Sequence, residues 1–197
     1  MTREELLQNA KPILFNTDMT VAILEDRKTV TRRLIKPQLS EECPVCKYVH
    51  NEYIYDVNAQ NIYCARCGEP LRHEKRAPYQ PGDILYVRET WQCWRAHRYE
   101  ANADIRFKAG GEDVRLEFAN GNTDSTDRFD YDTFVSKWFS HNGEWKPSLF
   151  MPKEAARIFL KVKDVRVERL QDITEEQTEE EGFQFTPPCL SQVSEDS

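Results

Sequence analysis

The amino-acid sequence predicts a mixed α+β protein, and two observations support this fold class. Residues 105–118 alternate apolar and charged side chains around Gly110 and Gly111, which is typical of a β-hairpin. Asn16 and Thr174 each precede a run with acidic residues in its first turn, which is typical of a capped α-helix. The chain has 197 residues, so we expect one domain with an insertion and not two full domains.

The first helix is expected to begin after Asn16 and to end near Asp26. Met19, Ala22 and Ile23 place apolar side chains at helical spacing. An aspartate tolerates the left-handed backbone conformation that commonly ends a helix. The basic residues that follow are therefore expected in a loop or a strand.

Strands are expected at several further places. A Pro-Gly turn precedes an apolar-rich strand at residues 83–88. Residues 158–163 and 165–170 fit one long strand, or two strands that meet at a bulge near Asp164. In the predicted hairpin, the clean alternation indicates that one face contacts water.

The last predicted helix begins with a capping box formed by Thr174 and Gln177, and Gly182 should end it. Glu181 then lies in the last turn, where a carboxylate opposes the helix dipole at a cost of a few tenths of a kcal/mol. On the residues alone, we interpret Glu181 as one more solvated glutamate of an acidic helix.

Positive charge is concentrated in one segment of an acidic chain. The net charge is −7, but residues 164–197 alone carry −8, which leaves residues 1–163 at +1. Five cationic side chains and no carboxylate lie between residues 27 and 39, namely Arg27, Lys28, Arg32, Arg33 and Lys36. Their field would attract an anionic partner such as a phosphate backbone. The alternative is a solvated basic surface that follows a helix.

Four of the six cysteines form two Cys-x2-Cys pairs with seventeen residues between them. This spacing lets two knuckles present four thiolates tetrahedrally to Zn(II), and the closed shell indicates a structural zinc ion. Free thiols or redox pairs are the alternatives, and His50 and His73 are spare ligands. Cys93 and Cys189 have no suitably spaced partner, and each is expected to be a small buried or incidental side chain and not a nucleophile. The expected ligands are Cys43, Cys46, Cys64 and Cys67.

The sequence also predicts the compartment. No apolar run approaches the roughly 18 residues that span a bilayer, and the first residues lack the apolar core and cleavage site of a signal peptide. We therefore expect a cytoplasmic protein with no membrane partner, whose cysteines remain reduced.

Four blocks of the sequence, in this order, resemble the ASCH domain family, and most closely the branch found in phages and prophages. The blocks are residues 11–17, 27–33, 82–91 and 164–174. The resemblance covers most of residues 11–37 and 78–182. It implies a PUA-like fold, which is a small mixed β-barrel with flanking short helices, in the cytoplasm of a bacterial host cell.

The resemblance also implies a domain organisation. Residues 1–40 and 76–182 would form the ASCH barrel, residues 41–75 an inserted zinc ribbon, and residues 183–197 a polar tail. Relatives continue after the Glu-Gly step into a final aromatic-rich strand, which the tail does not resemble. We therefore expect either a truncated chain or a barrel that closes differently.

Relatives of this family bind RNA or modified nucleosides in a cleft at a Lys-Thr-x-Thr segment, here residues 28–31. The leading hypothesis is therefore an RNA- or nucleotide-binding protein, in which Trp91 stacks on a base. The alternative places Trp91 in the core and makes Arg88 a salt-bridge partner on its strand. The phosphate contacts in the leading hypothesis are Arg27, Lys28, Arg32, Arg33 and Arg88.

A second hypothesis is an amidohydrolase. Some small relatives hydrolyse the acyl amide of N4-acetylcytidine, and their catalytic residues correspond by motif to Lys28, Thr31 and Glu181. Neighbouring arginines would lower the pKa of Lys28, so that its neutral amine takes the proton of the Thr31 hydroxyl. Thr31 would attack the acyl carbon, and Glu181 would carry the proton to the departing amine without zinc. A third hypothesis is a phage accessory protein that acts through protein contacts.

Overall fold

The computed structural model describes residues 2–34, 42–49, 53–56, 61–71, 78–118 and 130–183. None of the helices in these ranges is long and apolar enough to cross a membrane. The α-helices in these ranges are α1 (Arg3–Asn9), α2 (Thr17–Leu24), α3 (Tyr131–Trp138) and α4 (Glu175–Glu180). Short 3-10 helices are η1 (Ser148–Phe150), η2 (Lys153–Ala155) and η3 (Leu170–Asp172).

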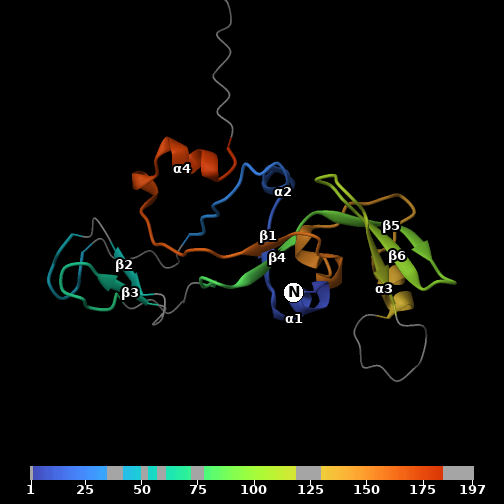
Figure 1. The fold of residues 1–197 in the computed structure, drawn as a ribbon, viewed down its shortest axis with the longest axis horizontal. Coiled ribbons are helices and arrows are strands. Elements are labelled where there is room, and N and C mark those ends of the chain that lie inside the picture. Colours follow the sequence, from blue (N-terminus) through green and yellow to red (C-terminus); the bar gives the residue numbers. More distant parts are fainter. Residues whose placement is uncertain are drawn as a thin grey trace, which may run out of the picture.

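The strands of the described ranges form three sheets, so the mixed α+β class is confirmed. The first sheet has the order β1 (Lys11–Leu14), β4 (Ile84–Arg88) and β8 (Phe159–Lys161), with β1 parallel and β8 antiparallel to β4. The second is the antiparallel meander of β5 (Trp91–His97), β6 (Asn102–Phe107) and β7 (Val114–Glu117). The third is the hairpin of β2 (Tyr53–Asp56) and β3 (Asn61–Cys64). Figure 1 shows this hairpin at one end of the molecule and the meander at the other, with β1 and β4 between them.

Within the described ranges, the strands do not close into the barrel that the resemblance implies. Only Glu89 and Thr90 separate β4 from β5, so one stretch of chain passes from the first sheet into the second and forms a corner between them. Glu89 is buried at this corner, and its two carboxylate oxygens accept hydrogen bonds from Arg157 at 2.9 and 2.8 Å. This pairing offsets the cost of burying a charge where the chain changes sheets.

The two larger sheets pack in two hydrophobic clusters, and the first sheet contributes Tyr86 of β4 to the cluster of the meander. The first sheet packs against α2 through Ile13, Phe15, Leu85 and Val87. The meander packs against α3, and its core contains the fully buried Trp91, Ala103 and Ile105 together with Phe134 of α3. Complete burial of a large apolar side chain contributes about 1.5–3 kcal/mol, so these two cores fix the sheets that carry the candidate site.

The predicted hairpin is present as β6 and β7, and the charged face of residues 105–118 contacts water as predicted, whereas the earlier part of β6 differs. Arg106 and Arg115 are exposed, as predicted, whereas Asn102 and Asp104 are buried. Arg115 Nε donates to Asp104 Oδ1 at 2.8 Å, and this hydrogen bond is the main reason why the pKa of Asp104 lies below its usual range. The alternating pattern could not reveal this pairing, because Asp104 precedes the stretch of residues 105–118 in which the pattern is seen.

Local signals placed the helix ends correctly. Met19 N donates to Asn16 Oδ1 at 2.8 Å, which caps α2 as predicted, and Asp26 has a left-handed φ of 55°. The predicted capping box is also present at the start of α4. Helix α1 was not predicted from the sequence, although Thr2 and Glu5 form a capping box of the kind that predicted α4.

The prediction of a strand at residues 165–170 is wrong. Regular pairing ends at β8 and at Val162, whose N–H donates to Asp83 O at 2.9 Å. The chain then leaves the sheet, and Val167 packs beside the cysteines. Of the predicted polar tail, only Phe183 is described, and residues 184–197 lie outside the described residues.

Candidate functional site

The two Cys-x2-Cys turns have the same backbone structure. Lys47 N donates to Cys43 O at 3.0 Å, and Gly68 N donates to Cys64 O at 2.9 Å. Lys47 and Gly68 follow their turns with left-handed φ angles of 57° and 71°. Each turn therefore brings its two sulfurs to the same side of the chain, as a zinc knuckle requires.

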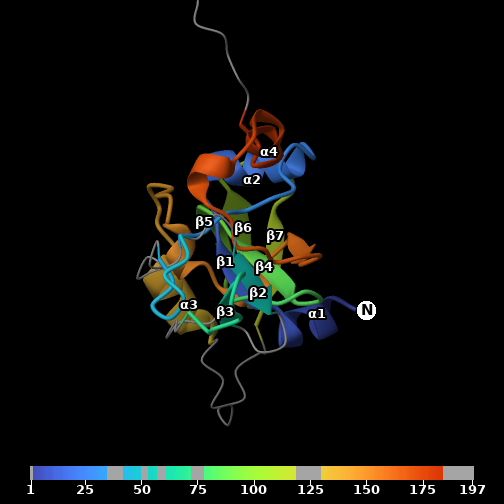
Figure 2. The same cartoon turned by 90° about the vertical axis from the view of Figure 1, so that its left-hand side faces the viewer.

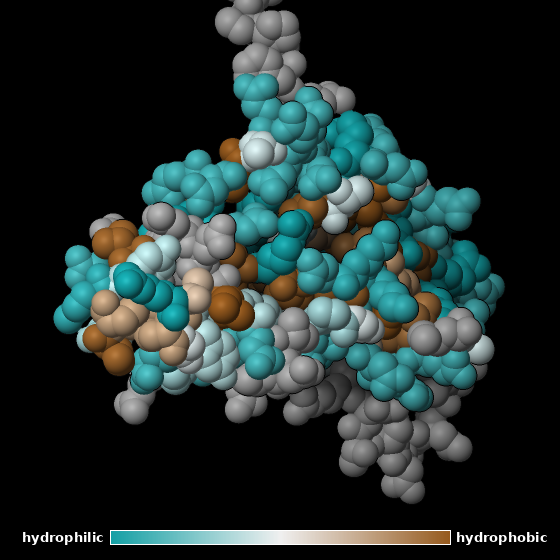
Figure 3. Space-filling model, turned by 60° about the vertical axis from the view of Figure 1, so that its left-hand side comes forward, coloured by the Kyte–Doolittle hydropathy of each residue, from teal (hydrophilic) through white to brown (hydrophobic). Residues whose placement is uncertain are grey.

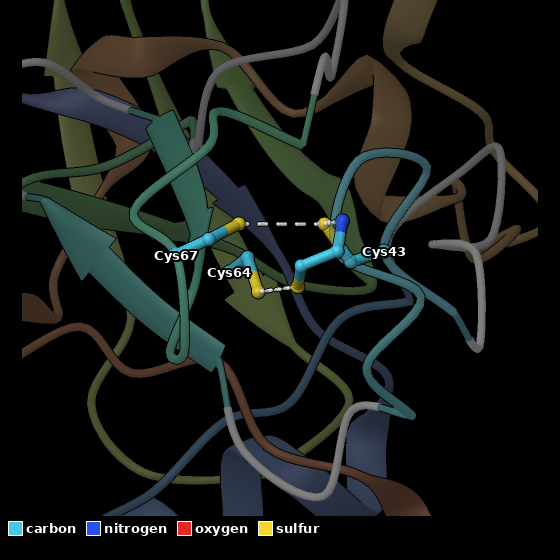
Figure 4. Close-up of side chains that lie close together, drawn as sticks. Cys43, Cys64 and Cys67 are labelled. Carbon is cyan, nitrogen blue, oxygen red and sulfur yellow. Dashed lines mark hydrogen bonds between the residues drawn. The ribbon is translucent and has the colours of Figure 1, made fainter.

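The four sulfurs form a cluster that fits a metal ion. Cys43 Sγ lies 3.6 Å from Cys67 Sγ, Cys46 Sγ lies 3.8 Å from Cys64 Sγ, and all four lie within 4.8 Å of one another. Figure 4 shows the side chains of Cys43, Cys64 and Cys67 pointing toward one another. A tetrahedron with metal–sulfur distances of about 2.3 Å has edges of about 3.8 Å, so the cluster can hold one ion. The spare ligands His50 and His73 lie outside the described residues.

The backbone prepares one of the thiols for binding a cation. Cys46 N donates to Cys43 Sγ at 3.5 Å, and this contact is the main reason why the pKa of Cys43 falls to about 7. Cys43 and Cys64 are fully buried, next to Ile62 and Leu71. Among the described residues the apolar cluster around these cysteines is small, so a metal bound by the four sulfurs would supply much of the core of the module.

A second group of predicted site residues is assembled where α2 and α4 meet. Lys28 and Glu181 form an isolated antiparallel backbone bridge. Thr29 N and Val30 N both donate to Glu180 O, at 2.8 and 3.0 Å. Figures 1 and 2 both show α4 beside α2, so the start of the basic segment is attached to the end of α4.

Gly182 permits this close approach. It has a left-handed φ of 90°, and a Cβ atom at this position would lie 2.7 Å from Ala22 Cβ and 3.2 Å from Lys28 Cβ. Arg27 NH1 donates to Gly182 O at 2.8 Å, and Arg27 Nε donates to Glu25 at 2.8 Å. Arg27, which we predicted as a phosphate contact, therefore holds the helices together and is paired with a carboxylate.

The Lys28 side chain is buried inside this junction. Its side chain is only 1% exposed, and its ammonium donates to Val30 O at 2.6 Å and to Glu181 O at 3.0 Å. Burial is the largest cause that lowers the pKa of Lys28, and the Glu181 carboxylate, 3.7 Å away, opposes this shift. Arg33 and Arg32 lower the pKa further. The predicted direction is confirmed, but its main cause is burial and not the neighbouring arginines.

Arg32 is also held in place, through two of its three side-chain nitrogens. Its NH1 donates to Glu181 Oε1 and to Gln177 O, both at 3.2 Å, and its NH2 lies 3.3 Å from Glu168 Oε2. Arg32 thus already has two carboxylate partners, which it shares with Lys28 and Arg166, and this makes it unsuitable as a free phosphate contact. Glu168 is a site residue that our sequence analysis missed, because no local pattern links it to position 32.

The structure brings together two of the three residues proposed for amide hydrolysis. Lys28 and Glu181 are in contact, whereas Thr31 is half-buried and makes no hydrogen bond to either of them within the described residues. A threonine nucleophile needs its base at hydrogen-bond distance. The described geometry therefore lacks the contact that would activate Thr31.

Arg33 and Arg88, two other predicted binding residues, line a single cleft of about 490 Å³. Its remaining wall is mostly apolar, and hydrophobic side chains line a hollow with a hydrophilic rim in Figure 3. Small-molecule sites commonly measure about 300–1,000 Å³, so the cleft has room for a nucleotide. The other lining residues are Pro12, Ile13, Leu14, Met19 and Tyr79.

Neither arginine of the cleft forms an ion pair with a carboxylate of the described ranges. Arg33 donates to Arg32 O at 3.0 Å and to Leu14 O at 3.2 Å. Arg88 donates to Met151 O at 3.1 Å and also to Leu149 O. A guanidinium has five N–H donors, so each side chain is held in place while some of its donors remain available.

Tyr79 is a cleft residue that our sequence analysis missed. Its hydroxyl donates to Pro12 O at 2.6 Å, which fixes the ring at the wall. Arg33 lies near enough to oppose the rise in the pKa of Tyr79 that burial causes. Tyr79 lies two residues before the Pro-Gly turn, and no sequence pattern assigned it to a site.

Trp91 does not reach the cleft. Its side chain is 0% exposed and its ring centroid lies 5.5 Å from that of Trp138 and 6.2 Å from that of Phe134. The prediction that Trp91 stacks on a base is therefore wrong, and the alternative core position is the correct one. Arg88 binds backbone carbonyls and not a carboxylate, so its alternative role as a salt-bridge partner is also not observed among the described residues.

Comparison of the chain with protein-family models, with curated proteins and with solved structures finds no match. The chemistry of the cysteine cluster, of the Lys28–Glu181 junction and of the cleft therefore has to indicate the function.

Proposed function

We propose that the protein binds a nucleotide-type anion, either a free nucleotide or one unit of an RNA strand, in the cleft lined by Arg33 and Arg88. One observation carries this proposal: two guanidinium groups from distant parts of the chain line one cleft without a carboxylate partner in the described residues. An anion supplied by a ligand would neutralise both.

The chemistry of the cleft favours phosphate together with a base. Guanidinium groups bind phosphate oxygens through pairs of parallel N–H donors. The walls contributed by Ile13, Met19 and Tyr79 offer apolar and aromatic surface against which a base can pack. A free inorganic anion would leave this surface unused, so a nucleotide fits the cleft better.

The binding proposal agrees with the resemblance to the ASCH family, and we propose that the chain is an ASCH-like protein whose ligand site includes Arg33. We also propose that the four cysteines bind Zn(II). Four thiolates in tetrahedral arrangement select zinc or iron over hard cations. Metal analysis of the purified protein should give one zinc per chain, and a different metal or none would refute this assignment.

Cytidine 5′-monophosphate is a suitable probe of the cleft. We expect its affinity, measured by calorimetry, to fall about tenfold or more in each of Arg33→Ala and Arg88→Ala, because each removes charge-assisted hydrogen bonds of about 1.5–3 kcal/mol. Arg66→Ala and Arg98→Ala are matched controls, because both arginines are exposed and lie outside the cleft. Equal affinity in all four variants would refute the cleft as the site.

Amide hydrolysis is a second candidate, favoured by the contact between Lys28 and Glu181. In this reaction the Thr31 hydroxyl would attack the acyl carbon, the C–N bond would break, and the amine would leave with a proton carried by Glu181. Water would then release the acyl group from Thr31. Because Lys28 is 1% exposed, the reaction would require the junction to open.

The second candidate is tested by incubation with N4-acetylcytidine. We expect cytidine and acetate from the unmodified protein and none from Thr31→Val, which retains the shape of the side chain but removes its hydroxyl. Production of cytidine by Thr31→Val at the original rate would exclude Thr31 as the nucleophile. If the unmodified protein releases no cytidine, this candidate is refuted while nucleotide binding is unaffected.

A further inference from the structure

Val167 and Glu168 are consecutive residues between β8 and η3, and their side chains contact two different parts of the molecule. Val167 packs against the hydrophobic cluster that contains Cys43 and Cys64. Glu168 Oε2 lies 3.3 Å from Arg32 NH2. One short stretch of chain therefore touches both the cysteine module and the basic segment.

The contact with Arg32 continues toward the cleft. Arg32 NH1 donates to Glu181 Oε1 and to Gln177 O, which attaches the basic segment to α4. Arg33 NH1 donates to Arg32 O at 3.0 Å, so the position of the Arg32 backbone helps to set that of the Arg33 guanidinium in the cleft. Glu168 is thus one of the two carboxylates that hold the residue next to a cleft arginine.

We propose that Glu168 is a positioning residue and that the metal-loaded cysteine module holds it in place through Val167. The proposal rests on metal binding by the four cysteines and, for its effect on ligand affinity, on the proposed cleft. Without the metal, the module loses most of its core, and Val167 loses the surface on which it packs. The Glu168–Arg32 contact then weakens, and with it the attachment of residues 29–33 to α4.

Coupling of this kind is reciprocal. If the metal stabilises the contact between Glu168 and Arg32, the contact must raise the affinity for the metal by the same factor. For a partly exposed ion pair this factor is small, about two- to fivefold. The metal affinity can therefore be measured without any nucleotide, and this separates the inference from the proposed function.

Hydrogen exchange tests the first half of the coupling, which is the effect of the metal on the attachment of residues 29–33 to α4. Thr29 N and Val30 N donate to Glu180 O, so their exchange rates report attachment of the segment to α4. Chelation of the metal should accelerate exchange at these two amides and leave the β5–β6 amides unchanged, which shows that the rest of the chain is folded. Unchanged exchange at residues 29 and 30 after removal of the metal would overturn the proposal.

The zinc affinities of two variants test the second half of the coupling, which is the effect of the Glu168–Arg32 contact on metal binding. In chelator competition, Val167→Ala and Glu168→Gln should each weaken zinc binding about two- to fivefold. Val165→Ala is the matched control, since it removes the same atoms two residues away and Val165 is not part of the cluster around the cysteines. Zinc affinity of Glu168→Gln equal to that of the unmodified protein would overturn the proposal, even if Val167→Ala destabilised the module.

The effect on ligand binding is the last step. Metal-free protein should bind cytidine 5′-monophosphate more weakly, by the same factor by which the nucleotide tightens zinc binding. If neither form binds the nucleotide, the proposed function fails, but the exchange rates and zinc affinities still decide whether Glu168 is coupled to the metal.

Discussion

Lys28 and Glu181 are separated by 153 positions in the sequence and face each other across an antiparallel backbone bridge. The Lys28 ammonium lies 3.0 Å from the backbone oxygen of Glu181 and 3.7 Å from its carboxylate. The backbone contact is therefore the closer of the two. This pair joins the segment after α2 to the end of α4, whether or not it also takes part in catalysis.

Gly182 should be essential for this junction. In Gly182→Ala, the new Cβ atom would lie 2.7 Å from Ala22 Cβ on a backbone with φ of 90°, and we expect the free energy of unfolding to fall by about 2–4 kcal/mol. Gly110→Ala is the matched control, because Gly110 has φ of 79° but no atom within 4 Å of the added Cβ. Urea unfolding measures both, and equal losses in the two variants would contradict a contact-based role for Gly182.

The structural features that the sequence predicts correctly are those that depend on neighbouring residues. The Asn16 cap, the Asp26 turn and the cysteine knuckles each depend on residues close together in the chain, so their patterns are visible in a single sequence. In contrast, the contacts of the cationic side chains depend on residues that are distant in the sequence. Arg32 finds Glu168 and Glu181 whereas Arg33 finds backbone carbonyls, and nothing in the basic segment distinguishes these two arginines.

The same reasoning applies to the aromatic residues. Trp91 and Tyr79 flank β4, and either ring could have faced a ligand on local pattern alone. Trp91 is buried because α3 supplies Phe134 and Trp138 as neighbours, and α3 begins 40 positions later in the sequence. That the described strands do not close into a barrel has a similar origin, since sheet order depends on pairing between distant strands.

The pKa of Lys28 predicts a pH dependence of stability. Because the folded-state pKa lies below the usual value of 10.5, the folded protein releases this proton at a lower pH than the unfolded chain. At neutral pH, burial of the charged ammonium lowers the free energy of unfolding. This loss is recovered as the pH rises from the folded-state pKa to 10.5. The difference in unfolding free energy between the unmodified protein and Lys28→Met should shift in favour of the unmodified protein over this range. A difference that stays constant up to pH 10.5 would contradict the lowered pKa.

Metal binding should depend on each cysteine of the cluster and on no other cysteine of the core. Cys64→Ser removes a fully buried ligand, and we expect it to lose most of its zinc on dialysis. Cys93→Ser alters an equally buried cysteine outside the cluster and should retain one zinc per chain. Atomic emission measures both, and retention of zinc by Cys64→Ser would contradict the four-sulfur site.

Trp91→Phe should lower the stability of the protein without changing its affinity for a nucleotide. The smaller ring leaves part of the core unfilled, so we expect the free energy of unfolding to fall by about 1–3 kcal/mol. The affinity for cytidine 5′-monophosphate should remain within about twofold of the original value, because Trp91 is fully buried away from the cleft. A loss of affinity at temperatures where the variant is fully folded would restore a stacking role for Trp91.

The salt dependence of binding to a short single-stranded RNA tests the central claim most directly. Each phosphate contact contributes about −0.7 to the slope of log affinity against log salt concentration. Removing both cleft arginines, in Arg33→Ala with Arg88→Ala, should therefore reduce the steepness of this slope by about 1.4. The charge-matched control, Arg66→Ala with Arg98→Ala, should leave the slope close to that of the unmodified protein. The account predicts this difference, and equal slopes for the two double variants would contradict it.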